Sequence, residues 1–309
     1  MRSILGPTVK EALENMLAHI ETEYDEIATF LDPAEVDTYR AYYKDMPIRE
    51  LPPERRLSAY RRFYRGYLRY LVTQLVEWEG APPRILDAGS GLGTQSILFA
   101  LLGAGVHGVD LRQDRVVIAE KRARYWEEKL NAKLDLSFAC ESVFSLPEKE
   151  TYDFIWVCQA ISHIDPAEEF LGLTCRLLKP GGRVVIYDPN GMHIPNQLYQ
   201  LKNRGVRVHR TYETHTGETV AYAVERLFTY GGIQRILRRS GFQIAHRECQ
   251  FHRFRGKPDD GVFERIFRRL DFLPVFTALF GCAFVVAGRK PITGGTATVS
   301  AQQSVGSRQ

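Results

Sequence analysis

Between residues 84 and 190, short apolar runs alternate regularly with amphipathic stretches, and this alternation constrains the fold more than any other feature of the chain. The apolar runs have the length and composition of buried strands, and the stretches between them have helical periodicity. Strands and helices that alternate in this way build right-handed βαβ units around a parallel sheet. The pattern therefore predicts an α/β fold with strands at 84–89, 106–111, 136–140, 152–160 and 183–190.

The sequence departs from this rhythm on both sides. Helical periodicity dominates the first 80 residues, where the run 54–78 carries an apolar and aromatic stripe. After the fifth expected strand comes an insertion, which is followed by a helix and by strands at 242–251 and 282–290. We expect a helical region that shapes a binding site, a sheet domain, an insertion within that domain and a disordered polar tail. These parts span 1–80, 81–290, 191–230 and 291–309.

Composition excludes some classes of protein. The 309 residues carry a formal net charge of +4, an excess too small to indicate nucleic-acid binding by itself. The five cysteines are scattered, and no two have C-x-x-C spacing, so we interpret them as reduced thiols of a cytoplasmic protein. The histidines of the insertion are not spaced like metal ligands, and no metal site is predicted from His193, His209 and His215.

One apolar run needs its own interpretation, because residues 272–288 include no charged side chain. The run is slightly shorter than the ~20 residues that a membrane-spanning helix needs. Pro274 and Gly281 divide it, which predicts a short helix, a turn and a buried strand. Basic residues precede the run and leave open a peripheral contact with an anionic membrane surface, through Arg265, Arg268 and Arg269.

The first expected strand ends in a glycine-rich turn with the sequence DAGSGLG. Small residues at Gly89, Gly91 and Gly93 let the backbone approach a ligand, and the helix that follows presents free N–H groups. In an open parallel sheet, ligands bind beyond the carboxyl ends of the strands, which is where this turn lies. The turn is therefore the first candidate for a binding site.

The spacing of the glycines and the acids near them narrow the choice of ligand. A dinucleotide site favours G-x-G-x-x-G, whereas this chain has G-x-G-x-G. Asp87 lies two residues before the first glycine, where it disfavours a pyrophosphate and suits a cationic group. Asp110 ends the second expected strand about twenty residues later, a position from which an acid accepts hydrogen bonds from ribose. We infer a nucleoside ligand with a positively charged part.

These segments resemble the motifs of the class I S-adenosylmethionine-dependent methyltransferases. The first motif of that family is similar to ILDAGSGLGTQSI, the second to VHGVDL, and the segment beside the adenine to ACESVFSLP. The fourth and fifth strands of the family, with their flanks, are similar to YDFIWVCQAISHIDP and LLKPGGRVVIYDPN. The resemblance covers about 84–190. It implies a Rossmann-like, seven-stranded mixed sheet whose last strand is antiparallel, with S-adenosylmethionine as the cofactor.

The resemblance also implies roles for individual residues. The three glycines lie against the methionine and ribose part of the cofactor, Asp110 binds the ribose hydroxyls, and Leu111 packs on the adenine. For Asp87 three roles stay open, namely orienting the turn, meeting the amino group of the cofactor, or capping the next helix. The adenine is flanked by Glu141, where the family often has Asp, and by Ser142 and Val143.

The expected fourth strand ends near the reactive end of the cofactor. Gln159 is the predicted cofactor contact there, because its amide can form a hydrogen bond. His163 follows as a candidate general base for an acceptor hydroxyl, with a structural hydrogen bond as the alternative. Asp188 either orients the acceptor or caps a turn. In the N-terminal region, Tyr64 is the residue expected to contact the cofactor from a covering helix, unless the tyrosine stripe packs only on the core.

The function that follows is methyl transfer from S-adenosylmethionine to a small-molecule or lipid-linked acceptor, with oxygen as the favoured atom over nitrogen or carbon. The segment QAISHI lacks the N-P-P-Y-like tetrapeptide of enzymes that methylate amino groups of nucleic acids, which argues against such an acceptor. Three alternatives remain: a cofactor-binding regulatory protein without turnover, a membrane-associated lipid methyltransferase, and a nicotinamide oxidoreductase. A nicotinamide oxidoreductase would have the G-x-G-x-x-G pattern, which this chain lacks.

Overall fold

The computed structural model describes residues 8–42, 66–251, 273, 275–276 and 280–292. At its centre is a seven-stranded sheet with the order β3-β2-β1-β4-β5-β9-β8. The first five strands are parallel, and β9 runs antiparallel to both of its neighbours, β5 and β8. The strands are β1 (Arg84–Ala88), β2 (Gly105–Asp110), β3 (Leu136–Cys140), β4 (Tyr152–Cys158), β5 (Leu178–Pro189), β8 (Gln243–Phe251) and β9 (Gly281–Arg289).

This sheet confirms the expected mixed topology with an antiparallel last strand. The start of the fifth strand differs from the expected residue 183, because α6 (Ala167–Leu177) is followed directly by β5, which begins at Leu178. In the N-terminal region, Pro33 is the first residue of a second helix, where its missing N–H costs nothing.

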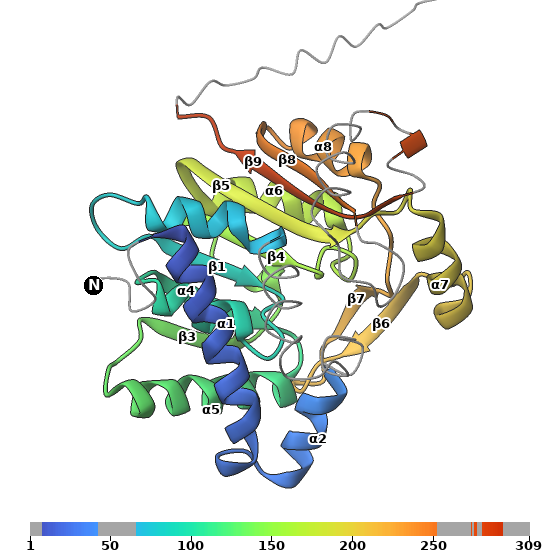
Figure 1. The fold of residues 1–309 in the computed structure, drawn as a ribbon. Helices are drawn as coiled ribbons and strands as arrows, with labels where there is room; N and C mark the ends of the chain where they lie inside the picture. Colours follow the sequence, from blue (N-terminus) through green and yellow to red (C-terminus); the bar gives the residue numbers. More distant parts are fainter. Residues whose placement is uncertain (1–7, 43–65, 252–272, 274, 277–279, 293–309) are drawn as a thin grey trace, which may run out of the picture.

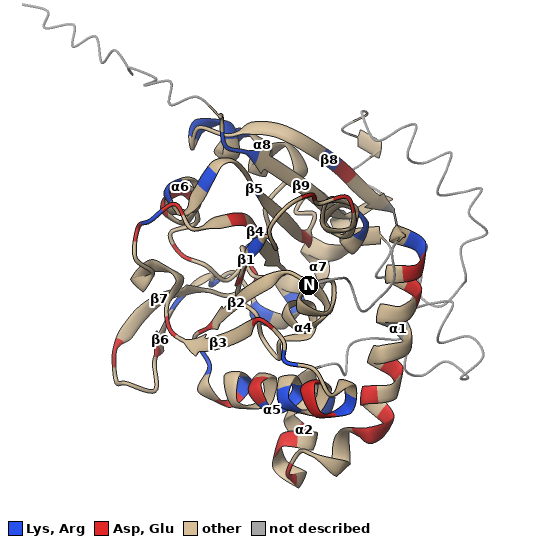
Figure 2. Ribbon diagram, turned by 90° about the vertical axis from the view of Figure 1, so that its left-hand side faces the viewer, with Lys and Arg blue, Asp and Glu red and all other residues tan. Residues whose placement is uncertain are grey.

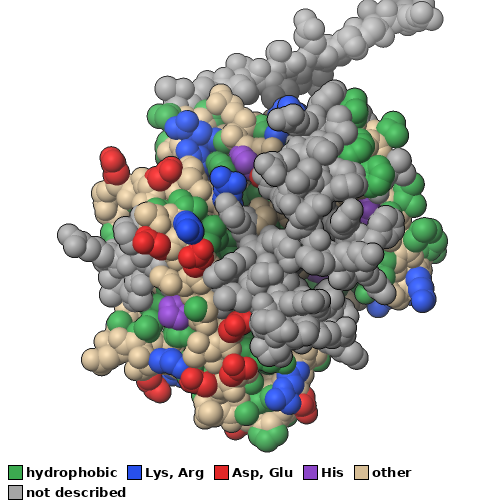
Figure 3. Space-filling view, viewed as in Figure 1, with side chains coloured by type: hydrophobic (Ala, Val, Ile, Leu, Met, Phe, Trp, Pro, Cys, Tyr) green, Lys and Arg blue, Asp and Glu red, His purple; other side chains and the backbone are tan. Residues whose placement is uncertain are grey.

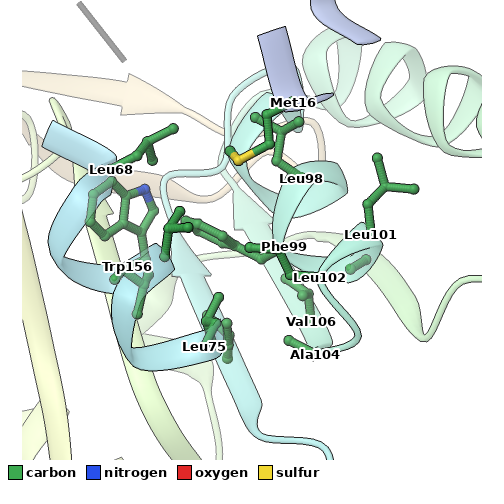
Figure 4. Close-up of a cluster of buried hydrophobic side chains, with 14 of the residues drawn as sticks. Met16, Leu68, Leu75, Leu98, Phe99, Leu101, Leu102, Ala104, Val106 and Trp156 are labelled. Carbon is green, nitrogen blue, oxygen red and sulfur yellow. The ribbon is translucent and has the colours of Figure 1, made fainter. Parts of the chain in front are cut away.

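Helices cover both faces of the sheet (Figure 1). On one face, α1 (Val9–Glu26), a helix at 66–76, α4 (Thr94–Leu101) and α5 (Gln113–Leu130) contribute to one hydrophobic cluster. Figure 4 shows part of it, with Leu68 of the 66–76 helix and Phe99 of α4 beside the ring of Trp156. On the other face, α6 and α8 (Tyr230–Arg239) pack over a second cluster.

The expected insertion after the fifth strand is present and folded. It consists of α7 (Ile194–Arg204) and a two-stranded antiparallel hairpin, β6 (His209–Glu213) and β7 (Thr219–Ala223). In Figure 1 the arrowheads of β1, β4 and β5 point toward this hairpin, so the insertion lies at the carboxyl edge of the parallel strands. That edge is where parallel α/β sheets bind ligands.

The apolar run near the C-terminus contains the buried strand that its sequence predicts. That strand is β9, whose residues 283–289 pair with β5. The helix expected before it lies mostly outside the described residues, as do the basic residues at 265–269 and the tail after residue 292. Among the helices of 8–42, 66–251 and 280–292, none is long and apolar enough to cross a membrane.

A buried ion pair fixes the N-terminal helices to the sheet domain. Arg122 of α5 is 1% exposed, and its guanidinium donates to the carboxylate of Glu23 in α1. The same guanidinium donates to the carbonyl of Leu92, within the glycine-rich turn, and to the hydroxyl of Thr94 at 2.9 Å. The second oxygen of Glu23 accepts from the indole N–H of Trp126 at 2.8 Å. One cation thus connects α1, α5 and the turn.

Around this pair, α1, α2 (Pro33–Tyr42) and α5 carry many charged side chains of both signs (Figure 2). Two of the contacts between them are ion pairs at the surface, Lys129 with Glu26 and Lys121 with Glu35. Exposed pairs of this kind contribute little to stability, with a median of about 0–1 kcal/mol. The buried Arg122 is therefore the contact whose loss matters.

We predict that Arg122→Met lowers the free energy of unfolding by about 3–5 kcal/mol, because it leaves the Glu23 carboxylate buried without its cation. The matched control is Arg124→Met, two residues along the same helix and exposed, which should change stability by less than about 0.5 kcal/mol. Urea denaturation of both variants measures the difference. Equal losses in the two variants would contradict the role given to the buried pair.

Candidate active site

The glycine-rich turn has a backbone that requires its glycines. Gly89, Gly91 and Gly93 have φ angles of 79°, 55° and 77°, in the left-handed region that other residues avoid. There is also no room for side chains, because a Cβ on Gly89 would lie 2.6 Å from the Cβ of Ala160. Gly93 is the N-cap of α4, so the turn delivers the free N–H groups of that helix to the carboxyl edge of the sheet.

Asp110 lies at the end of β2 and faces this turn. One carboxylate oxygen accepts a hydrogen bond from the backbone N–H of Gly91, and the other from that of Arg112, both at 2.9 Å. The residue is 8% exposed, and the nearest cation is Arg115, 3.9 Å from the first oxygen. Each oxygen keeps a lone pair for another donor, such as a ribose hydroxyl.

Asp87 lies in β1 and is more deeply buried than Asp110, with 1% of its surface exposed. Its carboxylate accepts a hydrogen bond of 2.6 Å from the hydroxyl of Ser96, in the first turn of α4. Burial raises the pKa of Asp87 to about 7, and the nearby Asp110 acts in the same direction. The contact with Ser96 fits the role of orienting the turn and the following helix, and we retain that role for Asp87 as a proposal.

The residues expected at the adenine lie after β2 and β3. Leu111 is partly buried, and Val143 packs into the hydrophobic cluster beneath α6. The hydroxyl of Ser142 accepts from the backbone N–H of Phe144 at 3.2 Å. The carboxylate of Glu141 lies 4.0 Å from Nε2 of His107. The four residues share one end of the sheet, and their contacts with an adenine remain a prediction.

At the end of β4 the backbone is strained. Gln159 has a φ of 51°, which is rare outside glycine, and its side chain is exposed while its N–H donates to the carbonyl of Tyr187 at 2.7 Å. Such strain is typical of functional positions. Tyr64 lies outside the described residues, but its stripe neighbour Tyr67 is buried and stacks on Tyr187 with ring centres 4.5 Å apart.

His163 sits in the loop after β4, between the sheet and the insertion. Its Nδ1 lies 3.0 Å from the carbonyl of Ala223, and its Nε2 lies 3.5 Å from the carboxylate of Glu225. The ring stacks on Tyr222 at 5.3 Å. Burial alone would lower the pKa of His163, but the Glu225 carboxylate and the Ala223 carbonyl together raise it above its ordinary value.

Glu225 is a residue that sequence reasoning missed. It follows β7 at the end of the insertion and has a φ of 50°, so its backbone is strained like that of Gln159. One carboxylate oxygen faces His163, and the other accepts from the amide of Gln200 in α7 at 3.0 Å. Hydrogen bonding to His163 lowers the pKa of Glu225, which keeps it ionised. No local pattern in the sequence connects residues 62 positions apart, so only the fold could reveal this pair.

The hairpin is held against the His163 loop by its backbone. The N–H of Ala223 donates to the carbonyl of His163, and the N–H of Arg226 to that of Ser162, both at 3.0 Å. Arg226 also pairs with Asp165 at 2.7 Å. These contacts fix the distance between His163 and Glu225.

Asp188, at the end of β5, is fully buried beside the same loop. Burial raises the pKa of Asp188 well above its usual range, whereas the imidazole of His163 acts in the opposite direction. The backbone and hydroxyl of Ser162 also lower the pKa of Asp188, but neither carboxylate oxygen has a hydrogen-bond partner of good geometry among the described residues. Asp188 is thus a buried acid with unused acceptor capacity at the carboxyl edge.

The three histidines of the insertion do not gather at this site. His209 is exposed and pairs with Asp165 at 2.9 Å, whereas His215 is exposed and lies 3.2 Å from the sulfur of Cys140. His193 caps α7. Within the described part of the chain, no group of three or more His, Cys, Asp or Glu side chains is arranged to hold a metal ion.

Residues 60–247, more than half of the chain, match the model of a family described as a methyltransferase domain. The chain therefore belongs to the methyltransferase domain family. This membership confirms the resemblance to class I S-adenosylmethionine-dependent methyltransferases drawn from the motifs, and with it the cofactor.

The relatives with curated functions match only a part of their length. The ubiquinone biosynthesis O-methyltransferase of Bradyrhizobium sp. (strain ORS 278) is 31% identical over 103 residues, which are 33% of this chain and 38% of that protein. The erythromycin 3''-O-methyltransferase of Saccharopolyspora erythraea is 34% identical over 123 residues, 38% of this chain and 39% of the relative. The match thus spans less than two fifths of either relative.

Among solved structures, the magnesium protoporphyrin IX methyltransferase of Synechocystis PCC 6803, with bound SAH, is similar in fold. Its TM-score is 0.51 and its sequence identity 17%, over 87% of this chain and 99% of that chain. At this identity the likeness supports the fold, including its mixed sheet.

The residues at the carboxyl edge fit this cofactor. The left-handed glycine turn brings the N-terminus of α4 to the carboxyl edge, and Asp110 has free lone pairs beside it. Asp87 is a buried acid beneath the turn, where a pyrophosphate would be disfavoured. The donor set of the site therefore agrees with the family.

We predict that Asp110→Ala weakens the binding of S-adenosylhomocysteine by between about tenfold and a hundredfold, because hydrogen bonds to a charged acceptor contribute roughly 1.5–3 kcal/mol. The control is Asp114→Ala, an exposed acid that pairs with Arg112 outside the turn. Isothermal titration calorimetry measures both, with NADH as a negative ligand. Unchanged affinity in Asp110→Ala would remove this residue from the cofactor site.

Proposed function

We propose that this chain transfers the methyl group of S-adenosylmethionine to a hydroxyl oxygen of a small-molecule acceptor. The observation that carries the proposal is the pair His163–Glu225, a protonatable imidazole held beside the carboxyl edge by the insertion. The two curated relatives named above are both O-methyltransferases, which supports oxygen as the acceptor atom.

The cofactor is placed by the turn and the strand ends. Gly89, Gly91 and Gly93 bring the backbone to it, and Asp110 accepts from its ribose. Leu111, Glu141, Ser142 and Val143 would hold its adenine, and Gln159 would contact the reactive end of the cofactor. When bound, S-adenosylmethionine supplies a methyl group that its sulfonium already activates, so the protein contributes mainly alignment.

The chain then has to accept the proton of the acceptor hydroxyl. Nδ1–H of His163 donates to the carbonyl of Ala223, which leaves Nε2 as the basic nitrogen. When Nε2 gains the proton, the imidazolium is stabilised by the carboxylate of Glu225. The carbonyl fixes the tautomer and the carboxylate strengthens the base. Asp188, buried beside this loop, is proposed to orient the acceptor through its unused acceptor positions.

The described part of one face of the molecule fits a small acceptor better than a polyanion. On the face shown in Figure 3, acidic and basic side chains are interspersed across the described surface. Extended basic surface is what recognition of a nucleic-acid backbone requires. A lipid-linked acceptor keeps the same chemistry at the site. The basic residues that motivated it, at 265–269, lie outside the described residues.

We predict that the pKa of His163 lies above its ordinary value of about 6.5 and falls in Glu225→Gln, because the amide no longer stabilises the imidazolium. NMR titration of the histidine ring protons measures both values without any acceptor. His107 serves as an internal reference, because burial lowers the pKa of His107. An unchanged pKa in Glu225→Gln would contradict the pairing.

Turnover provides the second test. Methyl transfer from radiolabelled S-adenosylmethionine to a panel of phenol and sugar acceptors should fall about 10²–10⁴-fold in His163→Gln, with S-adenosylhomocysteine affinity unchanged. The wild-type rate should rise with pH as His163 loses its proton, and Glu225→Gln should shift this rise to lower pH. Full activity of His163→Gln would exclude a general base, and wild-type protein that binds cofactor without methylating any acceptor would favour the regulatory alternative.

A further inference from the structure

A second cluster of polar side chains lies away from the carboxyl edge, where three strands meet the 66–76 helix. In the antiparallel registers, Arg183 of β5 is opposite Arg289 of β9, and Arg289 is opposite Gln243 of β8. Residues that are directly opposite point to the same face of a sheet. The three side chains therefore form a row across the sheet, on the face that carries the buried Val185 and Tyr187 of β5.

The two arginines of this row are like charges on directly paired strands. Neither forms an ion pair among the described residues, although like charges directly opposite on paired strands destabilise a sheet. Among the described residues, Nη1 of Arg183 donates to the amide oxygen of Gln74 at 2.5 Å. Nε of Arg183 and Nε of Arg289 are buried and without a hydrogen-bond partner. Buried donors are ordinarily satisfied, so the row has unused binding capacity.

The 66–76 helix flanks the cluster and forms one wall of a half-open pocket. Tyr70 and Gln74 of that helix, with Ile244 and Ala245 of β8, complete a lining around Arg183, Gln243 and Arg289, and the volume is about 420 Å³. The ring of Tyr70 stacks on His246 with centroids 4.4 Å apart. Burial raises the pKa of Tyr70, and both guanidinium groups act in the opposite direction, which places its hydroxyl within their field.

This pocket is separate from the methyl-transfer site. Arg183 precedes Asp188 by five residues along β5, which at ~3.3 Å per residue is about 17 Å of extended strand. The lining shares no residue with the carboxyl edge. Its volume lies within the range of small-molecule sites, ~300–1,000 Å³.

We propose that the pocket binds a small oxyanion, the phosphate or carboxylate group of a metabolite, between the guanidinium groups of Arg183 and Arg289. Guanidinium groups present parallel N–H donors that match the oxygens of phosphate and carboxylate. An anion there satisfies the orphaned donors and removes the repulsion between the arginines. Tyr70 and Gln243 add a hydroxyl and an amide for the remaining oxygens.

The test is a titration of the purified full-length protein with inorganic phosphate and, separately, with succinate, at constant ionic strength set with NaCl. Calorimetry gives the affinity, and thermal unfolding gives the stabilisation by the anion. The variants are Arg289→Gln and Arg183→Gln. Each removes one guanidinium group, so the proposal can still be tested if one of the variants does not fold. The matched control is Arg247→Gln, which removes an exposed cation from β8 outside the pocket.

We expect saturable binding of at least one anion to wild type and to Arg247→Gln, and a loss of tenfold or more in both pocket variants. Without anion, the pocket variants should unfold at a temperature equal to or higher than wild type, because the repulsion is relieved. Binding of phosphate alone or succinate alone identifies the group that the pocket accepts. Absence of saturable binding up to ~10 mM, or equal binding by wild type and both pocket variants, would overturn the proposal.

Discussion

The rest of the structure depends on the buried guanidinium of Arg122. It carries a full charge into a region of low dielectric, which is tolerated only because Glu23, the Leu92 carbonyl and the Thr94 hydroxyl surround it. Leu92 belongs to the glycine-rich turn, so the cation sets the height of the turn above the sheet. The positions of Asp110 and the glycines therefore depend on the contact between Arg122 of α5 and the turn.

The overall fold could be predicted from sequence because its signals are local. The strand runs, the glycine pattern of 89–93 and the acid at Asp110 are each visible within a few residues, and together they define the sheet and its binding edge. Arg122 could not be found in this way. In the segment EKRARYW it looks the same as its exposed neighbour Arg124, because the burial of a helical residue depends on what packs against it.

The residues of the candidate site also differ in whether their signal is local in the sequence. His163 was identified because it closely follows an expected strand at the carboxyl edge. Glu225 and the arginine row escaped notice because their partners are distant in sequence and their registers depend on pairing between strands. The strained backbones of Gln159 and Glu225 have no sequence signature, since neither is a glycine or an asparagine.

The origin of Glu225 has a consequence for how such a protein diversifies. The sheet supplies the imidazole, but the insertion supplies the carboxylate that sets its basicity and the wall beside it, through Tyr222 and α7. A change in the length or register of the insertion moves both Tyr222, which stacks on His163, and Glu225, which faces it. In the proposed reaction, substrate range and operating pH would therefore be inherited as one trait, because both depend on the insertion.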